Sequence, residues 1–269
     1  MNAQAIGIFD SGLGGLSVWQ ELFQQLPHES VIYVADSGYC PYGSRPQAEI
    51  ERLSDRIVRF LRGQACKLIV VACNTATAAA IADLRARYDL PFVGMEPAIK
   101  PAARATRSGV IGILATRGTF AGQHFQHSRT AYAHDKEVVI QEGQGLVELV
   151  ERGQTRSLEA YRLLERYLQP MLQAGADQVV LGCSHYPFLR ETMQEILAGR
   201  AEIVNPAPAV VRQVARLLTI HDLAAPPLRP STHTFYTTGQ LADLQRMVRE
   251  IVSAEQYDAL HFWRMQLSW

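Results

Sequence analysis

Two cysteines stand in nearly matching surroundings, and their thiols are the most reactive groups that the sequence offers. Cys73 lies in the segment 70–75, VVACNT, and Cys183 lies in the segment 180–185, VLGCSH. In each segment an apolar run ends at the cysteine and a polar pair follows. A buried parallel strand delivers a side chain to its carboxyl edge in this way. We therefore expect two thiols that share one task.

A second pair of segments repeats this relationship at a similar spacing. Residues 6–12, IGIFDSG, resemble residues 110–116, VIGILAT, and the offset from 10 to 116 is 106 residues, against 110 from 73 to 183. This period is too long for a solenoid repeat. It indicates two similar, pseudo-symmetric α/β domains with mostly parallel sheets and an active site in the cleft between them. Cys73 and Cys183 would then flank a small ligand from opposite sides.

The domain boundaries are expected where proline interrupts the pattern. Glu96-Pro97 breaks the chain after a short predicted strand, and Asn205-Pro206 precedes a predicted helix. We expect a discontinuous first domain of residues 1–96 and 207–269 and a second domain of residues 97–206.

The setting of each cysteine predicts its protonation. A helix is predicted to begin at Asn74, and a thiolate at a helix amino terminus has its pKa lowered from about 8.5. A lone buried cysteine is usually inert packing, but the pairing of Cys73 with Cys183 favours catalysis. His185 follows two residues after Cys183. It is either a core residue or, beside a base, a group that tunes protonation.

Several polar residues near predicted strand ends could have either a structural or a functional role. Asp10 could cap the next helix or take part in chemistry, and the glycines of residues 12–15 could form a tight turn or a nest of N–H groups for a carboxylate. They are not a dinucleotide fingerprint, because its third glycine would fall at Ser17. Tyr42 lies in the Pro- and Gly-rich loop 36–43, which is either a surface turn or a ligand loop.

The second half offers hydroxyls and one acid. Thr116 and Thr119 occupy the place that Asp10 and Ser11 hold in the first half. Their hydroxyls could bind a ligand carboxylate or cap a helix, and we expect capping. Glu151 is a candidate acid that would act through another side chain, although an exposed helical glutamate is the more common outcome.

The composition narrows the classes of function. The 269 residues are 48% hydrophobic and 19% charged, with 26 basic and 26 acidic residues, so neither a nucleic acid nor an anionic membrane is an expected partner. No signal peptide or membrane span is predicted, which favours the cytoplasm. The four cysteines are expected to be reduced, and their spacing matches no zinc pattern, so no metal site is predicted.

Five motifs in the same order resemble the glutamate racemases of the cofactor-independent aspartate/glutamate racemase family. They are FDSGLGG at 9–15, PYG at 41–43, ACNTA at 72–76, GCSHYP at 182–187 and FYTTG at 235–239. The resemblance implies conversion of L-glutamate to D-glutamate for peptidoglycan, in the cytoplasm, by an enzyme that is often a homodimer. It also implies that Cys73 and Cys183 are the two catalytic bases, with Asp10, Glu151 and His185 assisting.

The resemblance and the residue analysis together give a set of expected substrate contacts. It comprises Asp10, Ser11, Pro41, Tyr42, Gly43, Cys73, Asn74, Thr75, Thr116, Thr119, Cys183, Ser184 and His185. Inverting an α-carbon requires removal of a proton on one face and delivery of a proton on the other, which gives two thiols a purpose.

Pyridoxal phosphate would be another solution, but it needs a Schiff-base lysine. Lys67, Lys100 and Lys136 are the lysines of the chain, and Lys67 is expected at the wrong end of its strand. No cofactor is therefore expected. Three alternatives stay open: an aspartate racemase, a hydrolase with Cys183 as nucleophile and His185 as base, and a non-catalytic amino-acid binder.

Overall fold

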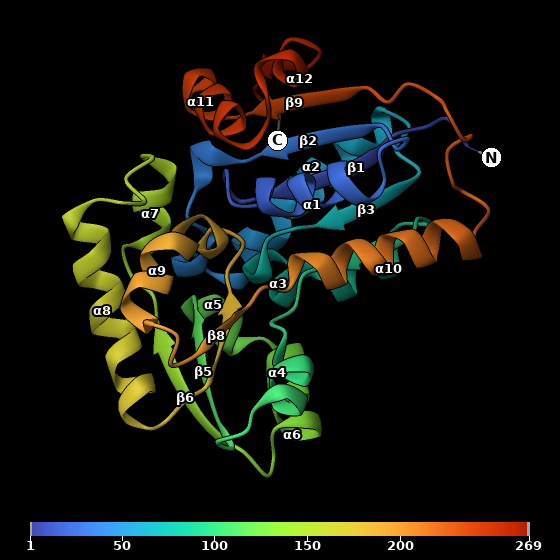
Figure 1. The fold of residues 1–269 in the computed structure, drawn as a ribbon. Coiled ribbons are helices and arrows are strands. Elements are labelled where there is room, and N and C mark those ends of the chain that lie inside the picture. The colour runs from blue at the N-terminus through green and yellow to red at the C-terminus, as the bar shows by residue number, and fades with distance from the viewer. Residues whose placement is uncertain (1, 268–269) are drawn as a thin grey trace.

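The computed structural model describes residues 2–267 and contains two parallel β-sheets (Figure 1). The first sheet has the order β10-β9-β2-β1-β3-β4, with β10 His261–Arg264, β9 His233–Thr237, β2 Val31–Ala35, β1 Ile6–Asp10, β3 Leu68–Val71 and β4 Phe92–Gly94. The second has the order β6-β5-β7-β8, with β6 Glu137–Glu142, β5 Val110–Ala115, β7 Gln178–Gly182 and β8 Glu202–Val204. Every pair of neighbouring strands is parallel.

Helices cover both faces of the first sheet, which explains why β1 and β3 are continuous apolar runs with every residue buried. The helices of this part are α1 Leu16–Gln25, α2 Gln47–Gly63, α3 Asn74–Arg87, α10 Ala207–Ile220, α11 Leu241–Ile251 and α12 Ala254–Asp258. Helix α1 packs beside α10, and α2 packs beside α3 in a separate apolar cluster. Within residues 2–267, none of the helices combines the length and the apolar character that crossing a membrane requires.

The second sheet is covered in the same manner. Its helices are α4 Ile99–Ala105, α5 Arg117–Ala121, α6 Gln123–Tyr132, α7 Leu146–Glu151, α8 Leu158–Gln173 and α9 Arg190–Leu197. Helices α8 and α9 pack together, and α4 packs with α6 (Figure 1). Strand β7 is entirely buried between these layers.

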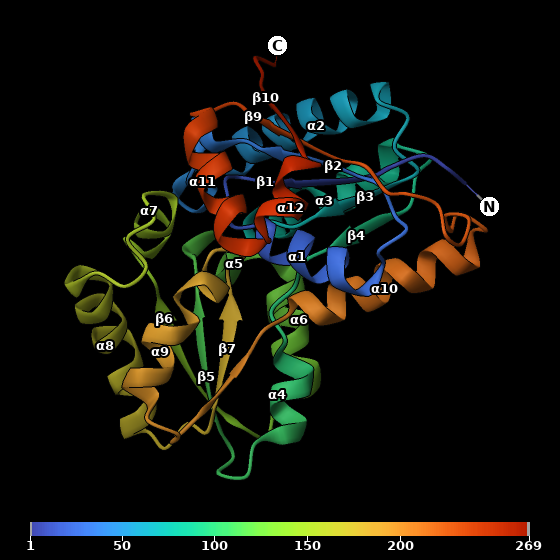
Figure 2. The same ribbon diagram turned by 45° about the horizontal axis from the view of Figure 1, so that its top comes forward.

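The two sheets share a common four-stranded pattern. The order β2-β1-β3-β4 matches β6-β5-β7-β8, so β1 corresponds to β5 and β3 to β7. The predicted pair of pseudo-symmetric α/β units is therefore confirmed. In Figure 2 the arrowheads of β5 and β7 point toward the half that holds the first sheet. The carboxyl edges of the second sheet thus lie against the first half of the molecule.

The sequence of residues 241–252 predicts a final helix. Helix α11 is found there, but the chain continues into α12 and then β10, which pairs with β9 at the sheet edge. Strand β10 is short and mostly exposed, so it lacks the apolar run that marks the central strands.

Candidate active site

Cys73 and Cys183 lie at the carboxyl ends of corresponding strands and line one cavity. Cys73 lies two residues after β3 and Cys183 directly follows β7, and each is only 5% exposed. The cavity wall consists of Ser11, Pro41, Tyr42, Gly43, Cys73, Asn74, Thr75, Thr116, Val147, Cys183, Ser184 and His185. Val147 is the only member of this wall that the sequence analysis did not name. As one of four apolar residues of α7, it carried no distinguishing signal in the sequence.

The thiol of Cys73 is held at the start of α3. The Ala76 N–H donates to Cys73 Sγ at 3.4 Å, and Sγ lies 3.7 Å from Ser11 Oγ. Burial raises the pKa of Cys73 to about 12 despite these two contacts, and the nearby Asp10 carboxyl adds to the rise. The expected lowering by the helix terminus is therefore wrong, because loss of hydration outweighs the favourable dipole. Cys73 is a thiol at neutral pH.

The thiol of Cys183 has a different partner. Its Sγ lies 3.8 Å from His185 Nδ1, and His185 Nε2 lies 2.7 Å from Glu151 Oε1. Burial of the imidazole opposes its protonation, but hydrogen bonds with Cys183, Cys40 and Glu151 outweigh burial and raise the pKa of His185 well above its ordinary value. Burial likewise disfavours the Glu151 carboxylate, yet the contacts with His185 leave the pKa of Glu151 lowered. An imidazolium–carboxylate pair therefore stands beside Cys183.

The position of Glu151 corrects the expectation of an exposed helical glutamate. Its side chain is 20% exposed, and its Oε1 accepts a 2.6 Å hydrogen bond from the Leu13 N–H. A Cβ at Gly12 would lie 2.2 Å from Glu151 Oε1, and one at Gly14 would lie 2.2 Å from His185 Nδ1. The glycine turn therefore does receive a carboxylate, and this carboxylate belongs to the protein itself. Its glycines are needed for that close approach.

Asp10 is buried behind the cavity wall and joins the two halves. Its Oδ2 accepts from the Gly12 N–H at 3.0 Å, and its Oδ1 accepts from Ser184 Oγ at 2.9 Å. Complete burial raises the pKa of the Asp10 carboxyl. Its predicted role as a simple helix cap is not what the structure shows, because its two oxygens hold the glycine turn and the segment after β7.

Thr116 and Thr119 form a hydroxyl chain across the same joint. Thr116 Oγ1 lies 2.8 Å from Thr75 Oγ1 and 2.9 Å from Thr119 Oγ1, and Thr119 donates to the Gly182 carbonyl at 3.2 Å. Thr116 precedes α5 without a side-chain capping bond, so the capping prediction is wrong for this residue. Thr116 lines the cavity, whereas Thr119 is set behind it.

Tyr42 is buried rather than part of a surface turn. It is 1% exposed, and its hydroxyl donates to Asp36 Oδ2 at 2.6 Å. Asp36 also accepts from Thr238 at 2.8 Å and lies 3.5 Å from Arg56. Burial raises the pKa of Asp36. Asp36 directly follows β2, as Cys183 follows β7, and this position was the signal in the sequence that could have identified it.

Lys67 lies where the sequence placed it, at the amino end of β3. Its Nζ lies 2.6 Å from Glu29 Oε2 and donates to the Asn2 carbonyl at 3.0 Å. Cys73 follows the opposite end of that strand. Lys67 is thus a structural ion-pair residue.

The cavity is nearly closed. Its volume is about 10 Å³, room for roughly one water molecule. A hollow of about 240 Å³ adjoins it and shares four wall residues, Pro41, Gly43, Thr116 and Val147. An amino acid can therefore reach the sulfur atoms only if these walls move apart.

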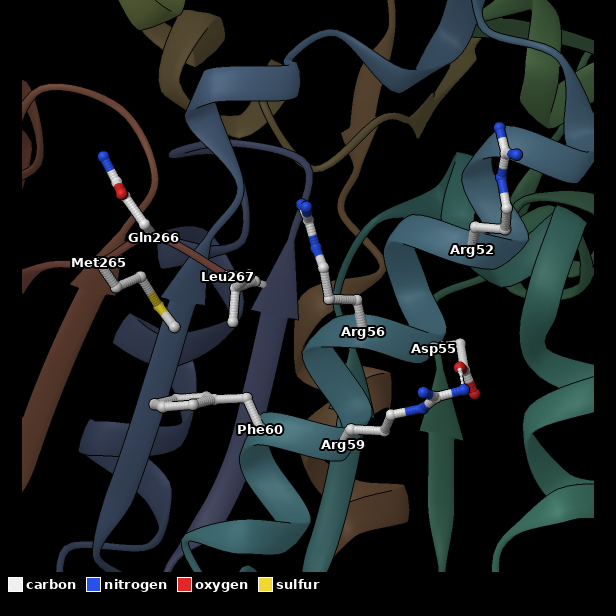
Figure 3. Close-up of a pocket in the computed structure, with 8 residues that line it drawn as sticks. All are labelled: Arg52, Asp55, Arg56, Arg59, Phe60, Met265, Gln266 and Leu267. Atoms are coloured by element: carbon white, nitrogen blue, oxygen red, sulfur yellow. Dashed lines mark ion pairs between the residues drawn. The ribbon is translucent and has the colours of Figure 1, made fainter. Parts of the chain in front are cut away.

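A larger volume does not by itself make a hollow a candidate active site. One of about 640 Å³ lies between α2 and the residues after β10 (Figure 3). There Arg59 pairs with Asp55 at 2.6 Å, and the sticks of Arg52 and Arg56 extend away from that pair. The chemistry of the lining, rather than volume, identifies the candidate site.

Comparisons with known proteins identify the family of this chain. The profile of the family described as Asp/Glu/Hydantoin racemase matches residues 6–214. Glutamate racemase of Herpetosiphon aurantiacus is 46% identical over 255 residues, which cover 95% of this chain and all of the relative. Glutamate racemase of Pseudomonas putida strain W619 is 50% identical over 221 residues, 82% of this chain and 83% of the relative.

A solved structure of similar fold has substrate bound. Escherichia coli glutamate racemase, in complex with L-glutamate and the activator UDP-MurNAc-Ala, superposes with a TM-score of 0.83 at 31% identity and 97% coverage of both chains. The paired cysteines, the two parallel sheets and these relatives lead to one conclusion: the chain belongs to the Asp/Glu/Hydantoin racemase family, among its glutamate racemases.

Proposed function

We propose that this enzyme interconverts L- and D-glutamate without a cofactor, with Cys73 and Cys183 as bases on opposite faces of the α-carbon. The observation that carries this proposal is that both sulfur atoms, one from each sheet, line a single cavity. The His185 imidazolium lies beside Cys183, where its positive charge would stabilise a thiolate, and Cys73 is the thiol. This is the charge arrangement that one direction of the reaction requires.

The proton balance is simple. The Cys183 thiolate takes the α-proton from one face of the substrate, and the C–H electron pair stays on carbon as a carbanion. The Cys73 thiol then gives its proton to the opposite face. Turnover therefore ends with a Cys183 thiol and a Cys73 thiolate, and the opposite enantiomer is converted from that state.

Substrate recognition falls to residues of the wall and to Asp10 directly behind it. We assign it to residues 10–11, 41–43, 74–75 and 184–185, with Thr116 beside them. The first turn of α3, which begins at Asn74, suits the substrate carboxylate because helix N–H groups favour an anion. Those donors also stabilise the negative charge that develops at the carboxylate when the α-proton leaves. Asp10, Glu151 and His185 hold the two thiol environments in place.

We also propose the domain division 1–96 with 207–269, and 97–206. The strands of these segments separate into the two sheets, and α10 packs on α1, which supports joining residues 207–269 to the first domain. Supply of D-glutamate for peptidoglycan, a cytoplasmic location and a homodimer follow from the family resemblance. Light scattering would test the dimer, and activation by UDP-MurNAc-Ala, known for the Escherichia coli complex, would be measured directly.

Solvent deuterium exchange tests the reaction itself. Each enantiomer of glutamate and of aspartate is incubated with the enzyme in heavy water, and the α-proton is followed by NMR. We expect exchange and inversion of glutamate that need both Cys73 and Cys183. Faster turnover of aspartate would contradict the substrate assignment. Activity that survives Cys73→Ala would instead favour the Cys183–His185 hydrolase.

A further inference from the structure

Cys40, which has no role in the proposed mechanism, lies close to the Glu151–His185 pair. One ligand atom each from Cys40, Glu151 and His185 lies within 4.8 Å of the other two. Thiolate, carboxylate and imidazole are the donors that zinc takes in proteins. We propose that these three side chains bind one Zn²⁺ or a similar borderline divalent cation, and that the bound ion inhibits racemisation by fastening the two halves together.

Solvent reaches this group without passing through the catalytic cavity. Cys40 and Glu151 line an open hollow of about 730 Å³, which shares Pro41 and Val147 with the catalytic cavity, while His185 belongs to the wall of that cavity. A cation can therefore arrive from this hollow, and a water molecule from it can supply the fourth ligand of a tetrahedral site.

The local geometry requires only side-chain adjustment. Donors around tetrahedral zinc, with bonds of about 2.0–2.3 Å, lie roughly 3.2–3.8 Å apart. His185 Nε2 and Glu151 Oε1, now 2.7 Å apart, must separate slightly, and Cys40 Sγ must approach. Gly12 leaves the necessary space, because a Cβ there would lie 2.9 Å from Cys40 Sγ and 2.2 Å from Glu151 Oε1.

The binding step releases protons and involves no redox change. Cys40 loses its thiol proton to solvent, since only the thiolate binds the metal. The His185 imidazolium loses its Nε2 proton, and its Nδ1–H remains toward Cys183, 3.8 Å away. Glu151 binds as the carboxylate that it already is. Acid should therefore weaken the site.

Inhibition follows from where the three ligands are anchored. Cys40 belongs to the loop between β2 and α2, whereas Glu151 ends α7 and His185 follows β7 of the other sheet. A cation shared by all three would hold these segments together. The cavity of about 10 Å³ must open to admit an amino acid. A cation that holds the two halves together therefore slows substrate association and lowers kcat/KM.

Binding is tested with Co²⁺, whose thiolate complexes absorb in the near ultraviolet. The titration uses a Cys73→Ser/Cys183→Ser background, so that the catalytic thiols do not contribute. We expect one thiolate-bound Co²⁺ per chain. A further Cys40→Ser substitution in this background should abolish the absorption band and weaken Co²⁺ binding by more than about tenfold. Even residues that only support metal ligands contribute about tenfold to metal affinity. Cys66→Ser, at a buried thiol remote from the group, is the matched control. A missing band, or a band that survives Cys40→Ser, overturns the proposal.

Inhibition is tested with zinc and the chain that retains both catalytic thiols. Zn²⁺ should lower kcat/KM reversibly, with recovery after EDTA, and Cys40→Ser should require more than about tenfold more zinc for the same loss, relative to its own metal-free rate. Cys66→Ser should behave as the unmodified enzyme. Equal inhibition of the Cys40→Ser variant would place zinc on the catalytic thiols and refute the inhibitory role. The Co²⁺ experiment needs no turnover, so its outcome is independent of the proposed reaction.

Discussion

The two thiol environments occupy corresponding places in the two sheets, yet they differ in charge. Cys73 contacts neutral groups: the Ala76 N–H donates to its sulfur, and its thiol donates to the Ser11 hydroxyl. The Asp10 carboxyl lies nearby. Cys183 faces an imidazolium that a carboxylate holds in place. Similar topology therefore provides the positions of the two sulfur atoms, while side chains from outside the shared pattern place a charged pair beside Cys183. This difference makes the surroundings of the two sulfur atoms electrostatically distinct before substrate arrives.

Replacing either sulfur should have the largest effect and tests whether both are needed. Cys73→Ser and Cys183→Ser should each lower racemisation by about 10²- to 10⁴-fold, since each removes a general acid–base group. Each variant should retain slow α-proton exchange from one enantiomer only, and the enantiomer should differ between the two variants. NMR in heavy water measures this. If both variants exchanged both enantiomers equally, the assignment of one sulfur to each face would be wrong.

Removing the Glu151 charge should remove the asymmetry. In Glu151→Gln the pKa of His185 falls, because its carboxylate partner is gone, so the imidazolium beside Cys183 is lost at lower pH. We expect kcat to drop by about ten- to a hundredfold and the alkaline limb of the pH–rate profile to move toward lower pH. Glu148→Gln, an exposed position on the same helix, is the control. If the alkaline limb of the pH–rate profile did not move, Glu151 would not control the protonation of His185.

A substitution beside Cys73 should lower the rate less than the substitution of Glu151. Ser11→Ala removes one hydroxyl 3.7 Å from Cys73 Sγ and leaves the charged pair intact. We expect a loss in kcat of about three- to tenfold, the worth of one neutral hydrogen bond, with the alkaline limb unchanged. Steady-state kinetics across pH would measure both. A shift of that limb as large as in Glu151→Gln would show that the two sides are not electrostatically distinct.

The same pair should make a small, pH-dependent contribution to stability. The pKa of His185 is raised in the folded protein. Its contribution to the free energy of unfolding is therefore complete below the pKa of the unfolded state, near 6.5, and is lost as pH rises through the raised pKa of the folded state. The pKa of Glu151 is lowered, so its contribution is present above its unfolded value near 4.3 and is lost as pH falls through the lowered folded value. Glu151→Gln should therefore destabilise most between about pH 4.3 and 6.5, by about 1–3 kcal/mol. Urea unfolding at several pH values measures this, and a pH-independent loss would contradict it.

The arrangement of strands and thiols could be predicted because it depends on local patterns. Buried apolar runs that end in a polar residue identify β1, β3 and β7 and bring Asp10, Cys73 and Cys183 to sheet edges. Eleven of the twelve wall residues follow from such edges and from the family motifs. The edge strand β10 was missed, since exposed short strands carry no such run.

The electrostatics could not be predicted because they depend on contacts between distant residues. The hydrogen bond from Leu13 to Glu151 joins positions 138 residues apart, and no local pattern signals it. The pKa of Cys73 was predicted with the wrong sign because the helix terminus is visible in sequence whereas the depth of burial is not. Thr116 and Thr119 were both expected at the substrate because they follow β5 as Asp10 and Ser11 mark the end of β1, yet only Thr116 lines the cavity.

The threonine bridge across the joint has a kinetic consequence. Thr75 and Thr116 come from opposite halves, and their hydroxyls meet at 2.8 Å beside a cavity that holds roughly one water molecule. Each catalytic cycle must break this contact when substrate enters and again when product leaves. The closed contact between the two halves, which excludes water from the carbanion, therefore also slows substrate entry and product release. Solvent viscosity should then slow this enzyme even when proton transfer is fast.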